Sequence, residues 1–185
     1  MGTLTVTSHV DGETYRPREL ELRGTGAPGA VVEITNQWGT VMGRPVVDAD
    51  GAWSLRRVFG PDADYALRLV MTRDDQTDEI GRFELRAPVW TEIELVAPAP
   101  GEGYGDGEAF TMTGRATPFA IVRATTSLGG QLFETAADRD GIWSNTRFHG
   151  PSYAYLIDLT QESAAGVTGD HPRFRFAPAD FPAER

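Results

Sequence analysis

The sequence predicts an all-β protein that consists of two sandwich-type modules in series. Three observations support this prediction. The chain repeats one pattern of residues after 90 positions, its apolar residues alternate with polar ones, and its 185 residues include 21 glycines and 12 prolines at short intervals. Alternation with a period of two is typical of strands with one buried face, and frequent turn residues divide such a chain into short strands.

The repeat is clearest in a turn motif. The segment Asp48–Ser54, with the sequence DADGAWS, returns 90 residues later as Asp138–Ser144, with the sequence DRDGIWS. The same offset relates further residues: Gly24 to Gly114, Pro28 to Pro118, Val32 to Val122, Gly39 to Gly129, Tyr65 to Tyr155 and Leu69 to Leu159. A repeat of this length predicts two copies of one domain. We place the first at 1–88 and the second at 89–178, joined near Pro88 and followed by a C-terminal tail, 179–185.

About seven strands are predicted in each domain. In the first they cover 3–7, 19–24, 30–36, 40–47, 52–58, 63–71 and 79–86. In the second they cover 91–97, 108–114, 119–126, 131–137, 142–148, 153–161 and 171–177. Seven short strands in a domain of this length are typical of an immunoglobulin-like (Ig-like) β-sandwich. A closed β-barrel is the alternative.

The motifs resemble those of the bacterial Ig-like repeats of surface proteins. The resemblance rests on Gly24–Val32, Val46–Ser54 and Tyr65–Leu69 and on their counterparts in the second domain. The second domain departs from the resemblance at Phe119, which stands where the first domain has Gly29. This difference affects the expected geometry of one turn and not the expected fold. The resemblance implies β-sandwich modules in series and provides no catalytic residues.

Composition argues against several classes of function. The chain has no cysteine, which excludes disulfides, thiolate zinc ligands and cysteine nucleophiles. All 17 basic residues are arginines, and 27 acidic residues bring the formal net charge to −10. A chain of this charge without a basic stripe is not expected to bind nucleic acid. It also has no apolar run of the length that a membrane-spanning helix needs, so we expect no membrane insertion.

No residues are predicted to act in catalysis or to bind a cofactor or metal. The histidines His9, His149 and His171 lack the spacing of metal ligands, and no nucleophile elbow, P-loop or dinucleotide motif occurs. Asp48 with Asp50 could suggest calcium, but the other ligands of an EF-hand are missing and Asp-Gly is ordinary turn chemistry. We therefore predict that the protein is not an enzyme.

Four aromatic residues are predicted to be structural. Trp53 and Trp143 follow the Asp-Gly turns, which places them early in a strand and in the core of each domain. Tyr65 and Tyr155 begin the next alternating run. Ig-like sandwiches often place there a tyrosine whose hydroxyl bonds to the backbone of the preceding corner.

Large apolar residues that break the repeat are the candidates for contact with a partner. Trp38 lies in a predicted turn and Leu128 at the matching position, and such groups at loop tips are unusual unless covered. Packing of Trp38 on its own sheet is the alternative. Tyr104 lies in a glycine-rich segment expected to be an exposed loop, and Phe181 in the tail is expected to fold back or dock on a partner. Trp90 follows the joint and is predicted to pack between the domains.

These features together predict a non-catalytic structural or interaction module without a cofactor. One interpretation is a decoration protein on the surface of a phage virion, made in the cytoplasm, because the sequence shows neither a signal peptide nor a wall-sorting motif. The alternatives are a spacer or adhesion fragment of a secreted, actinobacterial-type cell-surface protein, or a carbohydrate-binding accessory module. The predicted partner is accordingly a protein assembly, with carbohydrate as the alternative.

Overall fold

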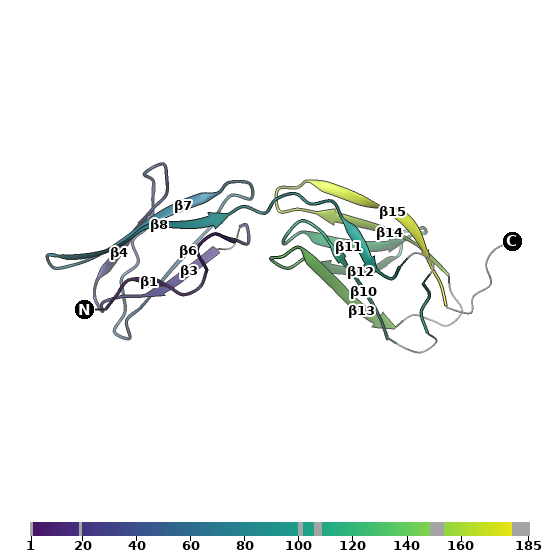
Figure 1. Cartoon of the computed structure of the whole chain (residues 1–185), viewed down its shortest axis with the longest axis horizontal. Coiled ribbons are helices and arrows are strands. Elements are labelled where there is room, and N and C mark those ends of the chain that lie inside the picture. The colour runs from purple at the N-terminus through teal and green to yellow at the C-terminus, as the bar shows by residue number, and fades with distance from the viewer. Residues whose placement is uncertain (1, 19, 100–101, 106–108, 149–153, 179–185) are drawn as a thin grey trace. The chain divides into compact units, whose positions relative to one another are not determined.

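The computed structural model describes residues 2–18, 20–99, 102–105, 109–148 and 154–178. The regular secondary structure of these residues consists of β-strands alone (Figure 1). No helix among these residues has the length and apolar character needed to cross a membrane. The chain divides into two units, Met1–Pro88 and Val89–Arg185. The predicted all-β class is confirmed.

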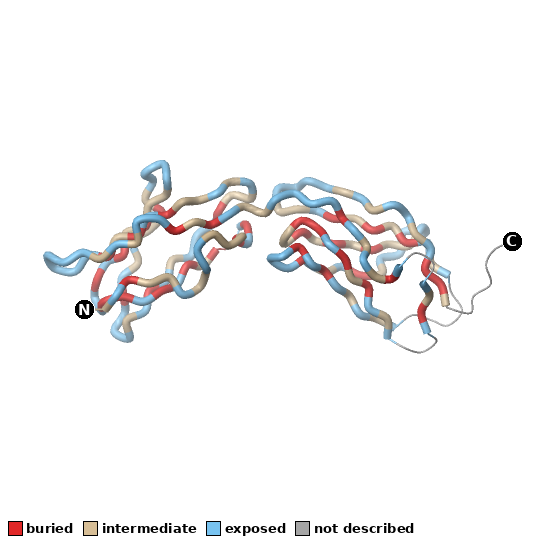
Figure 2. The backbone as a smooth tube through the Cα atoms, viewed as in Figure 1, coloured by how far each residue is buried: buried red, intermediate tan, exposed pale blue. Residues whose placement is uncertain are grey.

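The first unit contains a three-stranded and a five-stranded sheet. The smaller sheet has the order β1 (Thr5–Val6), β3 (Leu20–Thr25), β6 (Ala52–Arg57). The larger has the order β2 (Glu13–Thr14), β8 (Gln76–Arg86), β7 (Tyr65–Arg73), β4 (Val31–Thr35), β5 (Val41–Gly43). Buried residues of both sheets form one core, and they alternate with exposed ones along the strands (Figure 2). The unit is therefore a β-sandwich.

The second unit contains a three-stranded and a four-stranded sheet. The first has the order β13 (Ile142–Phe148), β10 (Ala109–Arg115), β9 (Glu94–Ala97). The second has the order β12 (Gln131–Ala136), β11 (Ile121–Thr126), β14 (Tyr155–Glu162), β15 (Thr168–Phe176). Their inner faces again share one core. Neither unit is the closed barrel considered above, because each sheet ends in edge strands.

In the first unit the strands differ from the predicted ones mainly in three places. Glu13–Thr14 forms an additional strand, parallel to the end of β8, so that the first unit has eight strands. The predicted strand 40–47 is limited to β5, with one further bridge between Val31 and Val46. Strands β7 and β8 extend to a turn of two residues, in which Asp74 has a φ of 52°. This turn lengthens the hairpin beyond its predicted ends.

Both predicted core tryptophans are buried, and each lies against a glycine of the neighbouring strand. Trp53 pairs in register with Gly24, and its indole Nε1 donates to the carbonyl of Thr25 at 3.1 Å. A Cβ on Gly24 would lie 2.4 Å from Cζ2 of Trp53. Trp143 and Gly114 repeat this arrangement in the second unit, again with a Cβ distance of 2.4 Å. The indole therefore requires glycine at these positions.

The repeated Asp-Gly turns use their first aspartate to bind the backbone. Oδ1 of Asp48 accepts hydrogen bonds from the N–H groups of Asp50 at 3.0 Å and Ala52 at 2.8 Å. Asp138 accepts the corresponding two at 2.9 Å each. Gly51 supplies the positive φ of 81° that the turn requires. The first aspartate of each pair thus has a structural role in its turn.

Phe119 adopts the turn conformation of the glycine that it replaces. Its φ is 62°, against 80° for Gly29. The hydrogen bond across the turn is the same in both units, from Ala30 to Ala27 and from Ala120 to Thr117, at 3.0 Å each. The departure from the repeat therefore leaves the turn intact, at the cost of a left-handed conformation that disfavours a side chain.

Replacing Gly24 with alanine is expected to lower the free energy of unfolding of the first unit by about 3 kcal/mol, because overpacking of a filled core is costly. The added methyl would meet the Trp53 ring and the carbonyl of Thr5. Chemical denaturation of the full chain followed by tryptophan fluorescence measures the change. Gly81→Ala is the matched control, since its nearest contact is a flexible glutamate side chain at 3.5 Å. Equal effects of the two substitutions would contradict the prediction.

Candidate interaction site on the first unit

Trp38 lies at the tip of the β4–β5 hairpin, in a turn held by a single asparagine. Oδ1 of Asn36 accepts hydrogen bonds from the N–H groups of Trp38 at 3.1 Å and Thr40 at 2.9 Å. Gly39 completes the turn with a φ of 76° and donates to the carbonyl of Asn36 at 2.9 Å. The indole itself is 65% exposed. The tip is therefore an ordered turn that presents a large aromatic side chain to solvent.

The tip is also fastened to the start of β7. The side-chain amide of Gln37 donates to the carbonyl of Asp64 at 2.8 Å and accepts from the N–H of Ala66 at 3.0 Å. The ring of Trp38 meets that of Tyr65 edge to face, with centroids 6.0 Å apart. These contacts define the position of Trp38 relative to the sheet.

A cluster of aromatic rings connects Trp38 to the core. Tyr65 contacts Phe59 at a centroid distance of 4.6 Å and Tyr15 at 5.8 Å, and Tyr15 contacts Phe59 at 5.8 Å. Tyr15 and Phe59 are fully buried, whereas Tyr65 is partly buried. The exposed indole therefore rests on rings that are packed into the sandwich.

Two tyrosine hydroxyls hold the loop 58–64 beneath this cluster. The hydroxyl of Tyr65 accepts a hydrogen bond from the N–H of Gly60 at 3.1 Å, which is the backbone contact predicted for this residue. The hydroxyl of Tyr15 lies between the carbonyls of Gly60 and Ala63, 2.8 Å from the latter. Burial, with nearby negative charge, raises the pKa of Tyr15. Sequence reasoning missed Tyr15, whose partners are more than 40 residues away.

A shallow groove of about 280 Å³ lies next to the tip, on the larger sheet. It is lined by Gln37, Asp64, Tyr65, Ala66, Arg82, Glu84, Leu85 and Arg86. Arg82 and Glu84 form an ion pair at 2.7 Å within it. An exposed indole beside a groove with polar and charged walls has the composition of a protein contact site, with an apolar anchor and a polar rim.

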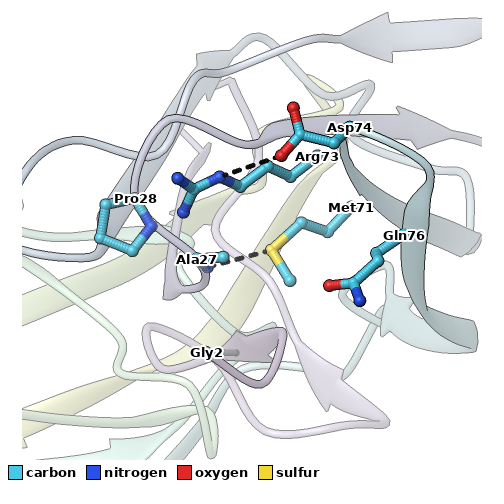
Figure 3. Close-up of a pocket in the computed structure, with 7 residues that line it drawn as sticks. All are labelled: Gly2, Ala27, Pro28, Met71, Arg73, Asp74 and Gln76. Carbon is cyan, nitrogen blue, oxygen red and sulfur yellow. Dashed lines mark hydrogen bonds and ion pairs between the residues drawn. The ribbon is translucent and has the colours of Figure 1, made fainter.

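A second pocket lies at the opposite end of β7, under the β7–β8 turn (Figure 3). It measures about 360 Å³ and is lined by Gly2, Ala27, Pro28, Met71, Arg73, Asp74 and Gln76. Arg73 and Asp74 lie 3.9 Å apart, and the N–H of Ala27 points to the sulfur of Met71 at 3.2 Å. The one acid and the one base of this pocket therefore offset each other.

In the second unit the matching hairpin tip carries Leu128 in place of tryptophan. The turn from Thr126 to Gly130 is closed by two backbone hydrogen bonds of 2.8 Å, and Leu128 is 95% exposed. The N–H of Ser127 donates to the carbonyl of Leu156 at 2.9 Å, so this tip also contacts the start of β14, as the first tip contacts the start of β7. The two units share the turn and differ in the side chain that it exposes.

Tyr104 is buried, so the prediction that it is an exposed contact residue is wrong. Its ring lies 4.8 Å from Phe176, and its N–H donates to the carbonyl of Ala177 at 3.1 Å. Tyr15 makes the corresponding bond to Arg86 at 3.0 Å. Tyr104 therefore fills the end of the second core as Tyr15 fills the first, and the glycines around it do not expose it.

Two further predicted contact residues have different outcomes. Trp90 packs against its own unit, since a Cβ on Gly169 would lie 3.0 Å from its ring, and the indole is 39% exposed. A role of Trp90 between the units stays a prediction. Phe181 and the tail 179–185 lie outside the described residues.

Tyr155 packs against the second core at the position matching Tyr65.

Solved structures of tandem domains are similar to this chain. The titin Z1Z2 chimera is 12% identical over 96% of this chain and 97% of that one, with a TM-score of 0.51. The fold is a tandem of Ig-like β-sandwiches. Fibronectin(III)-like modules of Clostridium thermocellum CbhA are 15% identical over 99% and 98%, with a TM-score of 0.42. The adhesin InvE of Yersinia pseudotuberculosis is 12% identical over 95% and 60%, with a TM-score of 0.35. No protein-family model and no curated protein sequence matches the chain.

Replacing Tyr15 with phenylalanine is expected to lower the free energy of unfolding of the first unit by about 1–3 kcal/mol, because partly buried carbonyls lose their hydroxyl donor. Those carbonyls belong to Gly60 and Ala63. Denaturant titration of the full chain at neutral pH provides the measurement. An unchanged free energy would show that the hydroxyl does not hold the loop.

The same variant has a distinct behaviour at high pH. A tyrosine in the unfolded chain ionises near about pH 10. The pKa of Tyr15 is raised in the folded chain. The stability that the un-ionised hydroxyl contributes is therefore complete below about pH 10 and is lost as the pH rises through the pKa of the folded chain. The phenylalanine variant should therefore lose less stability between neutral and strongly alkaline pH than the wild-type chain.

Proposed function

We propose that the chain is a non-catalytic module that attaches to a larger protein assembly through the hairpin tip carrying Trp38. The observation that supports this most directly is an exposed indole held in one position by Asn36, Gln37 and Tyr65. Tryptophan is enriched among the residues that dominate binding energy in protein interfaces. A side chain that is already positioned loses less conformational freedom on binding.

The comparison of the two units supports a role of Trp38 outside folding. Both hairpins have a glycine with positive φ at the same place, Gly39 and Gly129, with φ angles of 76° and 83°. The second unit forms its turn with Leu128 at the tip. The turn therefore forms without tryptophan at this position, which supports a role of Trp38 in binding.

A non-catalytic role agrees with the state of several carboxylates on the strands. Hydrogen bonds from Arg23, Arg68 and Arg173 lower the pKa of Glu21, Glu79 and Asp158, respectively. Carboxylates of this kind stay ionised at neutral pH and are poor general acids.

The assembly that we propose is a phage virion, with the chain as a decoration protein on its surface. The alternative is a bacterial cell-surface protein in which the two domains serve as a spacer or adhesion fragment. Binding of a carbohydrate by Trp38 is a further alternative, because an indole can stack on a sugar ring. The virion and carbohydrate interpretations place the contact at Trp38, whereas a spacer does not require one there.

A photo-reactive amino acid at position 38 tests the proposal in the native assembly. We expect p-benzoylphenylalanine in place of Trp38 to cross-link to one protein of the assembly, identified by mass spectrometry. A capsid or tail protein would support the virion, and a cell-envelope protein the alternative. The same residue in place of Leu128 is the matched control, and equal yields at both positions would contradict the proposal.

The variant Trp38→Ala separates binding from folding. Because the indole is 65% exposed, its loss is expected to change the free energy of unfolding by less than about 1 kcal/mol. Attachment to the assembly should be lost. Retention on polysaccharides that disappears in this variant would instead identify carbohydrate as the ligand.

A further inference from the structure

An arginine-rich groove lies at the end of the smaller sheet of the first unit where β3 begins and β6 ends. It measures about 780 Å³ and is lined by Arg16, Arg18, Leu20, Glu21, Arg56, Arg57 and Val58. Four of these residues are arginines and one is acidic. The chain as a whole has a net charge of −10. The groove is therefore a local excess of positive charge on an acidic protein.

The backbone positions this charge from two segments that are distant in the sequence. Arg56 pairs in register with Glu21 across β6 and β3, and Arg57 donates from Nη1 to the carbonyl of Met42 at 2.8 Å. Arg18 has a φ of 69° and donates its N–H to the carbonyl of Phe59 at 3.1 Å. The loop before β3 is thereby held against the end of β6, which brings the arginines together.

The groove already binds one carboxylate of its own chain. Oε2 of Glu21 lies 2.6 Å from Nη2 of Arg23 and 3.6 Å from Nη2 of Arg56. The Arg56 side chain is 82% exposed. A guanidinium has five N–H donors, so the pairing with Glu21 leaves most of those of Arg56 available. The site can therefore accept additional carboxylates.

The second unit shows that the fold does not require this charge. The pair that corresponds to Glu21 and Arg56 is Thr111 and Thr146, whose hydroxyls lie 2.6 Å apart. The segment from Tyr15 to Leu20 contains two arginines and one acidic residue, whereas the corresponding segment from 104 to 110 contains no arginine and two acidic residues. Arg16, Arg18 and Arg56 have no arginine at the matching positions of the second unit, whereas Arg57 is matched by Arg147. The three unmatched arginines indicate a binding role.

We propose that this groove binds an acidic peptide segment of a partner protein. The planar guanidinium can match a carboxylate with two parallel hydrogen bonds, and within the groove Arg56 already pairs with the carboxylate of Glu21 at 3.6 Å. The exposed Val58 at the rim offers an aliphatic contact for the methylene groups of glutamate side chains.

The composition of the groove favours a peptide over two other anionic polymers. None of the described residues that line it is aromatic, so they offer neither a sugar ring nor a nucleic-acid base a surface to stack on. The densely charged backbone of a nucleic acid would also be repelled by an acidic chain.

Fluorescence anisotropy of a labelled octaglutamate peptide with the full chain tests the proposal. We expect saturable binding at low salt that weakens at high salt, because exposed charges are screened. The double variant Arg16→Gln/Arg56→Thr should bind about tenfold more weakly. Threonine is the residue that the second unit has at the position of Arg56. Circular dichroism with a thermal scan checks that this variant is folded.

A second double variant controls for net charge. Arg44→Gln/Arg73→Gln removes the same charge from exposed sites that line neither groove and should leave the affinity within about twofold. Trp38→Ala should also have no effect, so failure here is distinct from failure of the proposed function. Absence of binding, or equal weakening in both double variants, would overturn the proposal. Tighter binding of a heparin fragment or a single-stranded oligonucleotide, lost in the groove variant, would do so as well.

Discussion

Each sandwich depends on the contact between a core indole and a glycine of the neighbouring strand. Gly24 pairs with Val6 on one side and Trp53 on the other, so the missing Cβ lets β1, β3 and β6 approach one another. A Cβ there would lie 1.9 Å from the carbonyl of Thr5, and one on Gly114 would lie 2.0 Å from that of Glu94. Both units therefore meet the same steric condition in the same way.

With the core determined in this way, the outer surfaces of the two units could diverge. A partly buried link is kept, since Arg57 donates to the carbonyl of Met42 and Arg147 to that of Leu132. The side chains that face solvent are different, with tryptophan against leucine at the hairpin tips and an ion pair against two threonines on the smaller sheets. The shared interior makes these differences informative, because one unit shows what the other could fold without.

The sequence predicted the features that depend on local pattern and missed those that depend on distant partners. The repeat, the strands and the exposed turn at Trp38 follow from alternation and turn residues. The strand at Glu13 and the burial of Tyr104 depend on parallel contacts with residues more than 70 positions away. The arginine groove joins segments about 40 residues apart in the sequence. The net charge of the whole chain is negative, so it gives no sign of this local positive charge. Phe119 shows the reverse case, in which the surrounding turn prevails over the residue's own preference.

The two candidate surfaces of the first unit rest on one buried support, although their chemistry differs. Arg18 bonds to the backbone of Phe59, the ring of Phe59 packs on Tyr65, and Tyr65 packs on Trp38. An apolar anchor contributes mainly to the lifetime of a complex, whereas exposed charges contribute mainly to the rate and selectivity of encounter. A partner with an acidic segment beside an apolar pocket could use both, and neither contact would require the sandwich to rearrange, because each side chain is already positioned by the core beneath it.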